Sequence, residues 1–340
     1  MEKTRLYKWD NVKFFLILGV VLVHFSNSIL GKSAVTDAVF IYGLVVIMPL
    51  FIFINGLFTK SYREKPLNGS RIFGLLMICL IYKLLIALAY LHYNRDELKV
   101  SILSDDAAPW YLFALVILMC LTYVLRNIKP AYVLIFSIIL ALLAGYDTAI
   151  GKEYTLSRII YFFPYFYMGY ILDPYKVGKA LNKLWLKIVA VVGLAASMIF
   201  TYINVSELVP YYNLATGGTG YYNIENQVGN VDTIGMTQRL ITYIIAIILS
   251  IFIISIMPNI RLPFISDMGT RTLQIYVLHR PILLIIEHEH VLSWIKNNIT
   301  YSHWAIPWLL VGVILTLILS LKIFEKPFNK IMDNKITSGE

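Results

Sequence analysis

Residues 9–25, WDNVKFFLILGVVLVHF, form an apolar run that carries one histidine, His24, near its end. A run of this length and composition is typical of a transmembrane helix. Because the hydrocarbon core of a bilayer disfavours ionisable side chains, a histidine within it indicates a functional site. Three roles are open for His24: a general base, a ligand, or a packing residue bonded to a neighbouring helix.

The composition of the 340-residue chain is that of an integral membrane protein. Hydrophobic residues make up 59% of it and charged residues 14%, whereas soluble domains carry about a quarter charged residues. The mean hydropathy is +0.71. The formal net charge of +9 would suggest nucleic acid as the partner of a soluble protein. Here most of the cations lie in short loops between apolar runs, so we expect membrane lipids as partners and no nucleic acid.

Ten apolar segments are long enough to cross a bilayer within a helical bundle, and none alternates as a barrel strand does. The predicted fold class is therefore all-α, a polytopic membrane protein with about ten transmembrane helices in a single domain, 1–340. The predicted segments are 11–30, 38–58, 70–91, 109–126, 131–147, 156–172, 184–203, 237–257, 271–288 and 304–324.

The distribution of cations predicts how these segments are oriented. An even number of spans places both termini on one side of the membrane. Nineteen Lys and Arg residues lie in the loops or near the segment ends on that side, and seven lie on the other. The positive-inside rule then places both termini in the cytoplasm, with 331–340 as a cytoplasmic tail. The longest loop, 204–236, lies on the outer side; its Gly, Asn and Tyr residues suit either a polar ligand such as a carbohydrate or a solvated loop.

One face of the first helix combines ionisable and apolar side chains. Asp10 and Lys13 are placed to form an ion pair at the spacing i, i+3, so we expect supporting roles for them. Asp10 is about 20 Å along the helix from His24, too far to orient its imidazole. We expect this face to point into the bundle. Its residues are Asp10, Lys13, Ile17, Val20, Val21 and His24.

A basic segment, TKSYREKPLNGSR (59–71), joins the second and third predicted spans. Its Lys60, Arg63 and Arg71 are candidate phosphate ligands, because cations at a membrane mouth suit phosphate groups and Arg adds bidentate contacts. The positive-inside rule explains the same cluster equally well. Lys83, inside the third span, needs a partner or water.

Further candidates lie at and within later spans. Trp110, Tyr111 and Arg158 lie at the outer ends of two spans, where they suit either an interfacial belt or an acceptor site. His279 and Arg280 are adjacent in the middle of 271–288, a depth at which packing alone is a poor explanation. The Glu-His-Glu-His run at 287–290 would need irregular backbone to hold a metal, because residues i and i+2 of a helix do not share a face. We expect no metal site.

Five motifs in order resemble the membrane-bound acyltransferase-3 family. They are the opening run 9–25, PLFIFINGLFTK (49–60), WYLFAL (110–115), SRIIYFFPYFYMGY (157–170) and GTRTLQIYVLHRP (269–281). The last three look closest to the branch of fucose 4-O-acetylase-like sugar O-acetyltransferases. The resemblance covers about residues 5–330.

The resemblance implies ten or more helices, acetyl-CoA as acyl donor and a sugar hydroxyl as acceptor. It implies that His24 is the catalytic histidine. His279 is the second catalytic candidate, because of its depth in the predicted span 271–288. Lys60, Arg63, Arg71 and Lys83 are then expected to bind the donor. The family's Arg-x-x-Arg motif is replaced here by Lys60-Ser-Tyr-Arg63, and Arg71 stands alone. Glu325 resembles the acidic residue at the family's last helix.

The expected function is thus O-acetylation of an envelope or capsular polysaccharide, or of its lipid-linked precursor, in a bacterial plasma membrane. Trp110, Tyr111, Arg158 and Arg280 are expected to bind the acceptor. The main alternative is a transporter of an acyl group or a lipid-linked saccharide, since intramembrane His and Arg would suit that role. A sensor or scaffold of an envelope-polymer complex is a third interpretation.

Overall fold

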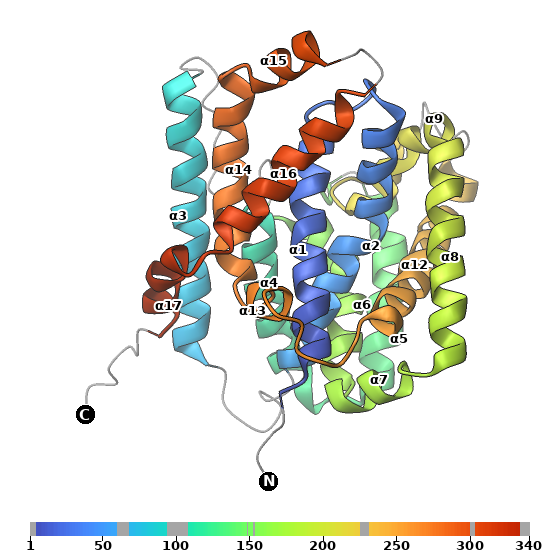
Figure 1. The fold of residues 1–340 in the computed structure, drawn as a ribbon. Helices are drawn as coiled ribbons and strands as arrows, with labels where there is room; N and C mark the ends of the chain where they lie inside the picture. Colours follow the sequence, from blue (N-terminus) through green and yellow to red (C-terminus); the bar gives the residue numbers. More distant parts are fainter. Residues whose placement is uncertain are drawn as a thin grey trace.

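The computed structural model describes residues 5–59, 68–93, 108–147, 149–151, 154–224, 231–299 and 303–333. The regular structure in these ranges is helical, without a strand, as the predicted fold class requires. Ten longer helices of these described ranges form the body of the molecule (Figure 1). They are α1 (Tyr7–Asn27), α2 (Ala34–Thr59), α3 (Gly69–Tyr93), α4 (Trp110–Val124), α5 (Pro130–Leu143), α6 (Leu156–Ile171), α8 (Leu184–Ile203), α12 (Val231–Ile256), α14 (Thr272–His288) and α16 (Ala305–Leu319).

Shorter helices connect these ten or cap the ends of the bundle. They are α7 (Pro174–Ala180), α9 (Val205–Leu208), α10 (Tyr212–Thr216), α13 (Ile265–Met268), α15 (Val291–Asn298) and α17 (Glu325–Asp333). Single 3-10 turns also occur, at Leu125–Asn127, Ala144–Tyr146, Val209–Tyr211, Tyr221–Ile224 and Lys322–Phe324.

Each of the ten predicted segments overlaps one long helix, and several of these helices have the length and composition of membrane spans. Six qualify: α1, α2, α3, α4 with its 3-10 extension, α8 and α12. The pair formed by α16 and α17, bent by 62°, makes a seventh if it is one span. The chain is therefore a polytopic helical membrane protein. The number of spans and the cytoplasmic placement of the termini stay predictions.

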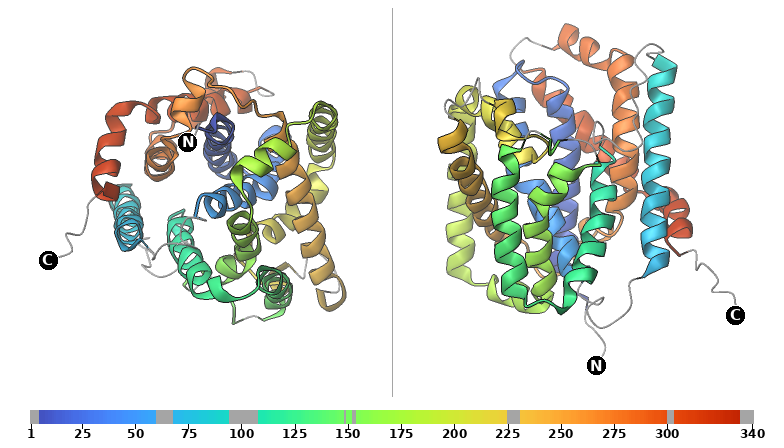
Figure 2. Two further views of the ribbon diagram at one scale, coloured as in Figure 1. Left: turned by 90° about the horizontal axis from the view of Figure 1, so that it is seen from below. Right: turned by 180° about the vertical axis from the view of Figure 1, so that it is seen from behind.

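The bundle is built around α1 and α2, which pack against each other (Figures 1 and 2). α1 also contacts α14 and α16, while α2 makes its largest contact with α6. The face of α1 predicted to point inward does so: Ile17 and Val21 are fully buried, and Asp10 is 6% exposed. At the periphery, α8 buries few side chains and exposes large apolar ones such as Ile188 and Val192, as a lipid-facing helix does.

Two glycines allow α2 and α6 to approach closely. A Cβ on Gly56 would lie 2.0 Å from the carbonyl oxygen of Phe166, and a Cβ on Gly169 would lie 2.0 Å from that of Phe53. Small residues at such contacts are the usual means by which membrane helices bring their backbones together. This contact places the aromatic face of α6 next to the centre of the bundle.

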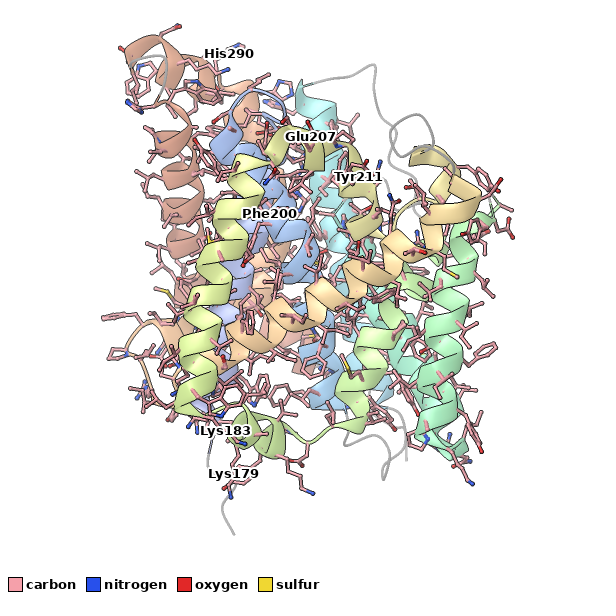
Figure 3. The ribbon with its side chains drawn as sticks, turned by 90° about the vertical axis from the view of Figure 1, so that its right-hand side faces the viewer. Lys179, Lys183, Phe200, Glu207, Tyr211 and His290 are labelled. Carbon is pink, nitrogen blue, oxygen red and sulfur yellow. The ribbon has the colours of Figure 1, made fainter. Side chains whose placement is uncertain are left out.

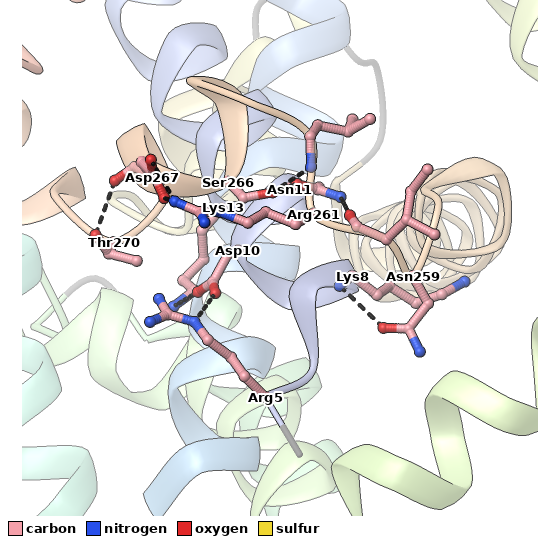
Figure 4. A network of polar contacts seen from close by, with 12 residues as sticks. Arg5, Lys8, Asp10, Asn11, Lys13, Asn259, Arg261, Ser266, Asp267 and Thr270 are labelled. Carbon is pink, nitrogen blue, oxygen red and sulfur yellow. Dashed lines mark hydrogen bonds and ion pairs between the residues drawn. The ribbon is translucent and has the colours of Figure 1, made fainter.

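A polar network fixes the start of α1 (Figure 4). Asp10 pairs with Arg5 at 2.8 Å and with Lys13 at 3.0 Å, which confirms the predicted i, i+3 pair. The hydrogen bond and charge of Asp10 raise the pKa of the Arg5 guanidinium. The Asn11 side chain donates to the carbonyls of Pro258 and Ile260, which join α1 to the segment after α12.

The two ends of the bundle differ in their side chains. The basic end, where α1 begins and α7 lies, carries Lys179 and Lys183 (Figures 1 and 3). The loop end carries Glu207, Tyr211 and His290. His24 lies in the part of α1 toward the loop end, whereas Arg71 begins α3 at the basic end.

Candidate functional site

His24 lines a cavity of about 470 Å³, here called the His24 cavity. Its ring is half-buried and comes from the last turns of α1. The walls come from α1, α2, the start of α4, α6, α14, and α10 with the segment after it. The lining residues are Val20, Val23, His24, Asn27, Phe40, Gly43, Leu44, Ile47, Met48, Ala108, Trp110, Arg158, Phe162, Tyr212, Asn213, Ala215, Thr216, Gly218, Thr219 and Tyr276.

His279 lies behind His24 rather than in the cavity. The two ring centroids are 5.0 Å apart, and His279 is fully buried. Its Nδ1 lies 3.1 Å from the carbonyl oxygen of Ile275 and 2.8 Å from that of Tyr276. Since carbonyl oxygens only accept, Nδ1 carries the proton and Nε2 keeps its lone pair. Nε2 is buried and has no hydrogen-bond partner among the described residues.

Two of the predicted acceptor residues, Arg158 and Trp110, lie in the same cavity as His24. The Arg158 guanidinium carbon lies 4.4 Å from the centre of a Trp110 ring. Trp110 also stacks on Phe162, with centroids 5.4 Å apart and planes 18° apart. The cavity therefore combines an imidazole, a guanidinium held by cation–π contact and an aromatic wall.

The outer loop predicted to offer aromatic and amide groups contributes one wall of this cavity. Tyr212 packs against Phe40 with ring centroids 5.5 Å apart, and Asn213 lies beside it in the lining. The loop then turns at Gly217, where φ is +62° and a Cβ would lie 2.4 Å from the Tyr161 ring. Glycine is required there for both reasons.

Arg239 holds this loop against the bundle and is a residue whose role the sequence did not suggest. It is 2% exposed, and it donates to the carbonyls of Ala141 and Thr219. Its guanidinium carbon lies 4.3 Å from the centre of the Tyr221 ring. The Tyr221 hydroxyl donates to the carbonyl of Leu142, and burial raises the pKa of Tyr221 to about 12. Thr219 is thereby fixed as part of the cavity wall.

Arg71 lines a second, smaller space of about 180 Å³, here called the Arg71 pocket. Tyr111 lies in this pocket rather than in the His24 cavity, and its hydroxyl accepts a 2.6 Å hydrogen bond from Asn55. Met332 of α17 contributes to the rim. The predicted donor residues Lys60 and Arg63 lie outside the described residues.

The two spaces adjoin at three side chains that line both of them: Val20, Met48 and Tyr276. Val20 is one helical turn before His24, about 6 Å along the axis of α1. Tyr276 donates its hydroxyl to the carbonyl of Ala108 and packs edge-on against Tyr82 and Tyr111. We call these three residues the junction. Tyr276 was missed in the sequence, although its position one turn before His279 on the same helix face is a usable signal.

Two other predicted charges lie outside both spaces. Lys83 is half-buried on α3. Arg280 forms a 3.6 Å ion pair with Glu287 along α14. Neither is among the residues that line the His24 cavity or the Arg71 pocket.

Glu325 fastens the beginning of α14 to the end of α16. Its carboxylate lies 3.1 Å from Nε of Arg271, whose Nη1 donates to the carbonyl of Ser320. Gln274 adds hydrogen bonds to the carbonyls of Leu319 and Leu321. These contacts fix Thr272 and Leu273, which line the Arg71 pocket. In the described part of the chain, no group of three His, Cys, Asp or Glu residues is arranged to hold a metal ion.

The comparison with known families identifies the family of the chain. The family model described as an acyltransferase domain matches residues 6–325, nearly the whole chain. No curated protein and no solved structure gives a significant match. The chain belongs to the acyltransferase-3 family of membrane acyltransferases, as the five motifs predicted. Its place in the sugar O-acetyltransferase branch stays a prediction.

Proposed function

We propose that this membrane acyltransferase transfers an acetyl group from acetyl-CoA to a sugar hydroxyl, with His24 as the general base. The donor binds at the Arg71 pocket and its thioester reaches past the junction. The acceptor is an envelope or capsular glycan, or its lipid-linked precursor, and it binds in the His24 cavity. The observation that carries this proposal is the sharing of Val20, Met48 and Tyr276 between the two spaces.

The donor side follows from the charge and position of Arg71. A guanidinium matches the geometry of phosphate oxygens, which the coenzyme carries at the end remote from its thioester. Arg71 at the basic end therefore suits the phosphates, and the narrow junction suits the uncharged arm that leads to the thioester. Placing the phosphates at the rim keeps their charge out of the apolar interior.

The acceptor side follows from the contents of the His24 cavity. Its volume of about 470 Å³ is in the range of small-molecule sites. Arg158, Asn27 and Asn213 supply polar groups in the lining, and Trp110 and Tyr212 supply aromatic ones. This mixture is suited to a sugar, which has both hydroxyl groups and apolar ring faces.

The reaction requires two proton transfers, one to His24 and one from it. His24 accepts the proton of the sugar hydroxyl as the hydroxyl oxygen forms a bond to the thioester carbonyl carbon. The carbon–sulfur bond then breaks, and His24 returns the proton to the thiolate of the released coenzyme. The guanidinium of Arg158 is the cation that shares the cavity with His24, and we assign it the stabilisation of the transient oxyanion as well as acceptor binding.

The test is transfer of labelled acetyl by the purified protein in lipid nanodiscs, with acetyl-CoA as donor and fractionated envelope polysaccharide as acceptor. The wild-type protein is expected to label the glycan covalently. His24→Gln should lower kcat by about 10²- to 10⁴-fold, the contribution of a general base. His303→Gln, at an exposed histidine remote from the cavity, is the matched control. Full activity of His24→Gln contradicts the assignment of the base. If the protein cleaves acetyl-CoA but no glycan becomes labelled, the assignment of a glycan acceptor is wrong.

A further inference from the structure

Lys8 is a buried cation at the basic end of the bundle. The residue is 1% exposed, and its ammonium group donates one 3.0 Å hydrogen bond, to the carbonyl oxygen of Ile254. No carboxylate of the described residues forms an ion pair with it. An ammonium group has three donors, so two remain. A buried charge is costly unless further partners compensate it.

A polar pocket of about 210 Å³ surrounds this lysine and is separate from both spaces of the acyl-transfer site. Lys179 and Asn182, at and after the end of α7, line it together with Asn259. The Asn259 side-chain oxygen accepts from the backbone N–H of Lys8, as Figure 4 shows. Its amide N–H groups are therefore left for a ligand. The lining of this Lys8 pocket holds hydrogen-bond donors and two cations but no carboxylate.

An apolar groove of about 250 Å³ lies beside α7, the helix that also borders the Lys8 pocket. Val177 and Ala180 of α7 line the groove, whereas Gly178 and Lys179 of the same helix line the pocket. Ile254 connects them in a second way, because its side chain lines the groove and its carbonyl accepts from Lys8. The remaining walls come from α2, α6 and α12 and are almost entirely apolar.

We propose that this pair of spaces binds one anionic phospholipid, with the phosphate against Lys8 and Lys179 and an acyl chain in the groove. The charge of the pocket matches a lipid phosphate, and the groove matches a hydrocarbon chain. Lys183 lies at the same end of the bundle (Figure 3), where basic side chains meet the anionic headgroups of a leaflet. The positive-inside rule assigns that leaflet to the cytoplasm.

The acyl donor is a poor occupant of this pocket. Arg71 lies on α3, and the Lys8 pocket is formed by α1, α7 and the segment after α12. α3 and α7 lie on different sides of α1, both in the side view of Figure 1 and in the view from below in Figure 2. No residue lines both the Lys8 pocket and the Arg71 pocket.

The headgroup is tested by measuring lipid binding to the purified full-length protein with native mass spectrometry. Dioleoyl phosphatidylglycerol is expected to bind at least about fivefold more tightly than dioleoyl phosphatidylcholine, the effect of one cation near an anionic headgroup. Lys8→Gln and Lys179→Gln should each remove most of this preference. Gly178→Leu should do the same by filling the pocket, since a Cβ there already meets Lys8 Cδ at 3.9 Å.

The matched control is Lys176→Gln, an exposed lysine of α7 that does not line the pocket. It should leave the preference unchanged. Equal binding of the two lipids, or equal losses from Lys176→Gln and Lys179→Gln, overturns the proposal in favour of diffuse surface charge. Displacement of the lipid by acetyl-CoA overturns it in favour of a coenzyme site. Lys179→Gln and Gly178→Leu keep the test valid if Lys8→Gln does not fold.

The acyl chain is tested separately with Ala180→Trp, which places a large side chain in the groove. This variant should weaken phosphatidylglycerol binding while Lys8 and Lys179 remain in place. Glycerol 3-phosphate, which has the phosphate but no acyl chain, should not displace the lipid at equal concentration. Displacement by glycerol 3-phosphate, or unchanged lipid binding by Ala180→Trp, contradicts a lipid site and indicates a site for a free phosphate.

Discussion

The imidazole rings of His24 and His279 lie 5.0 Å apart, and His24 alone of the two lines the cavity. His279 is fixed by hydrogen bonds from Nδ1 to two carbonyls of its own helix. This arrangement gives the two histidines different roles. His24 is placed to exchange a proton with a ligand, and His279 is placed to hold the ring of His24.

A double-mutant cycle separates these roles. His279→Asn keeps a donor for the Ile275 carbonyl, as Asn55 does for Phe51, but removes the ring behind His24. We expect kcat to fall with the acceptor KM unchanged, and by less than in His24→Gln. The double variant should be no slower than His24→Gln alone, because His279 acts through His24. Additive losses in the labelled-acetyl assay would assign His279 a direct role in the reaction.

The junction gives a second prediction. Met48→Trp enlarges a side chain that lines both spaces, so the thioester should no longer reach His24. Transfer should fall at least tenfold while binding of acetyl-CoA at the rim, measured by calorimetry, changes little. Met48→Leu conserves the volume and is the control. Normal transfer by Met48→Trp would show that the acyl group takes another path.

The fold was largely predictable because length and hydropathy determine where helices lie in a membrane protein. All ten predicted segments overlap a long helix, and the bounds differ by a few residues. The connecting helices were not predicted: α7, for example, is a short run after Pro174 whose lysines were assigned to the positive-inside pattern. The sequence also did not reveal that Gly56 and Gly169 form one contact, because they belong to segments more than a hundred residues apart.

The sequence predicted several residues of the site, but it did not predict which of them lie in the same cavity. His24, Trp110 and Arg158 were each identified, yet only the packing of α1, α4 and α6 shows that they share a cavity. Trp110 and Tyr111 were assigned together, although neighbours on a helix point about 100° apart. The structure accordingly places Tyr111 in the Arg71 pocket. Arg239 and Lys8 entered the sequence analysis only as cations in the count for the positive-inside rule. Both lie near the end of a predicted span, where the sequence does not show whether a side chain is buried.

The contact between α2 and α6 gives a third prediction, for stability. Gly169→Ala places a methyl group 2.0 Å from the Phe53 carbonyl oxygen, so the helices must separate. We expect a loss of about 1–3 kcal/mol, typical of overpacking. Thermal unfolding in detergent measures it. Gly69→Ala is the control, since a Cβ there has no neighbour within 4 Å. Equal melting temperatures for the two variants would contradict the close contact.

Arg71 gives the last prediction, which separates donor binding from chemistry. Arg71→Gln should raise the KM for acetyl-CoA about tenfold or more, the effect of losing a hydrogen bond to a charged group. At saturating donor, kcat should be unchanged because Arg71 lies beyond the junction from His24. Acetylpantetheine carries the same thioester but no phosphates, so wild type and variant should use it equally well. Arg126→Gln, at a cation that packs on Tyr123 away from the pocket, should have no effect. If Arg71→Gln loses acetylpantetheine activity to the same extent as acetyl-CoA activity, the phosphates do not bind at Arg71, and its role is to maintain the shape of the pocket.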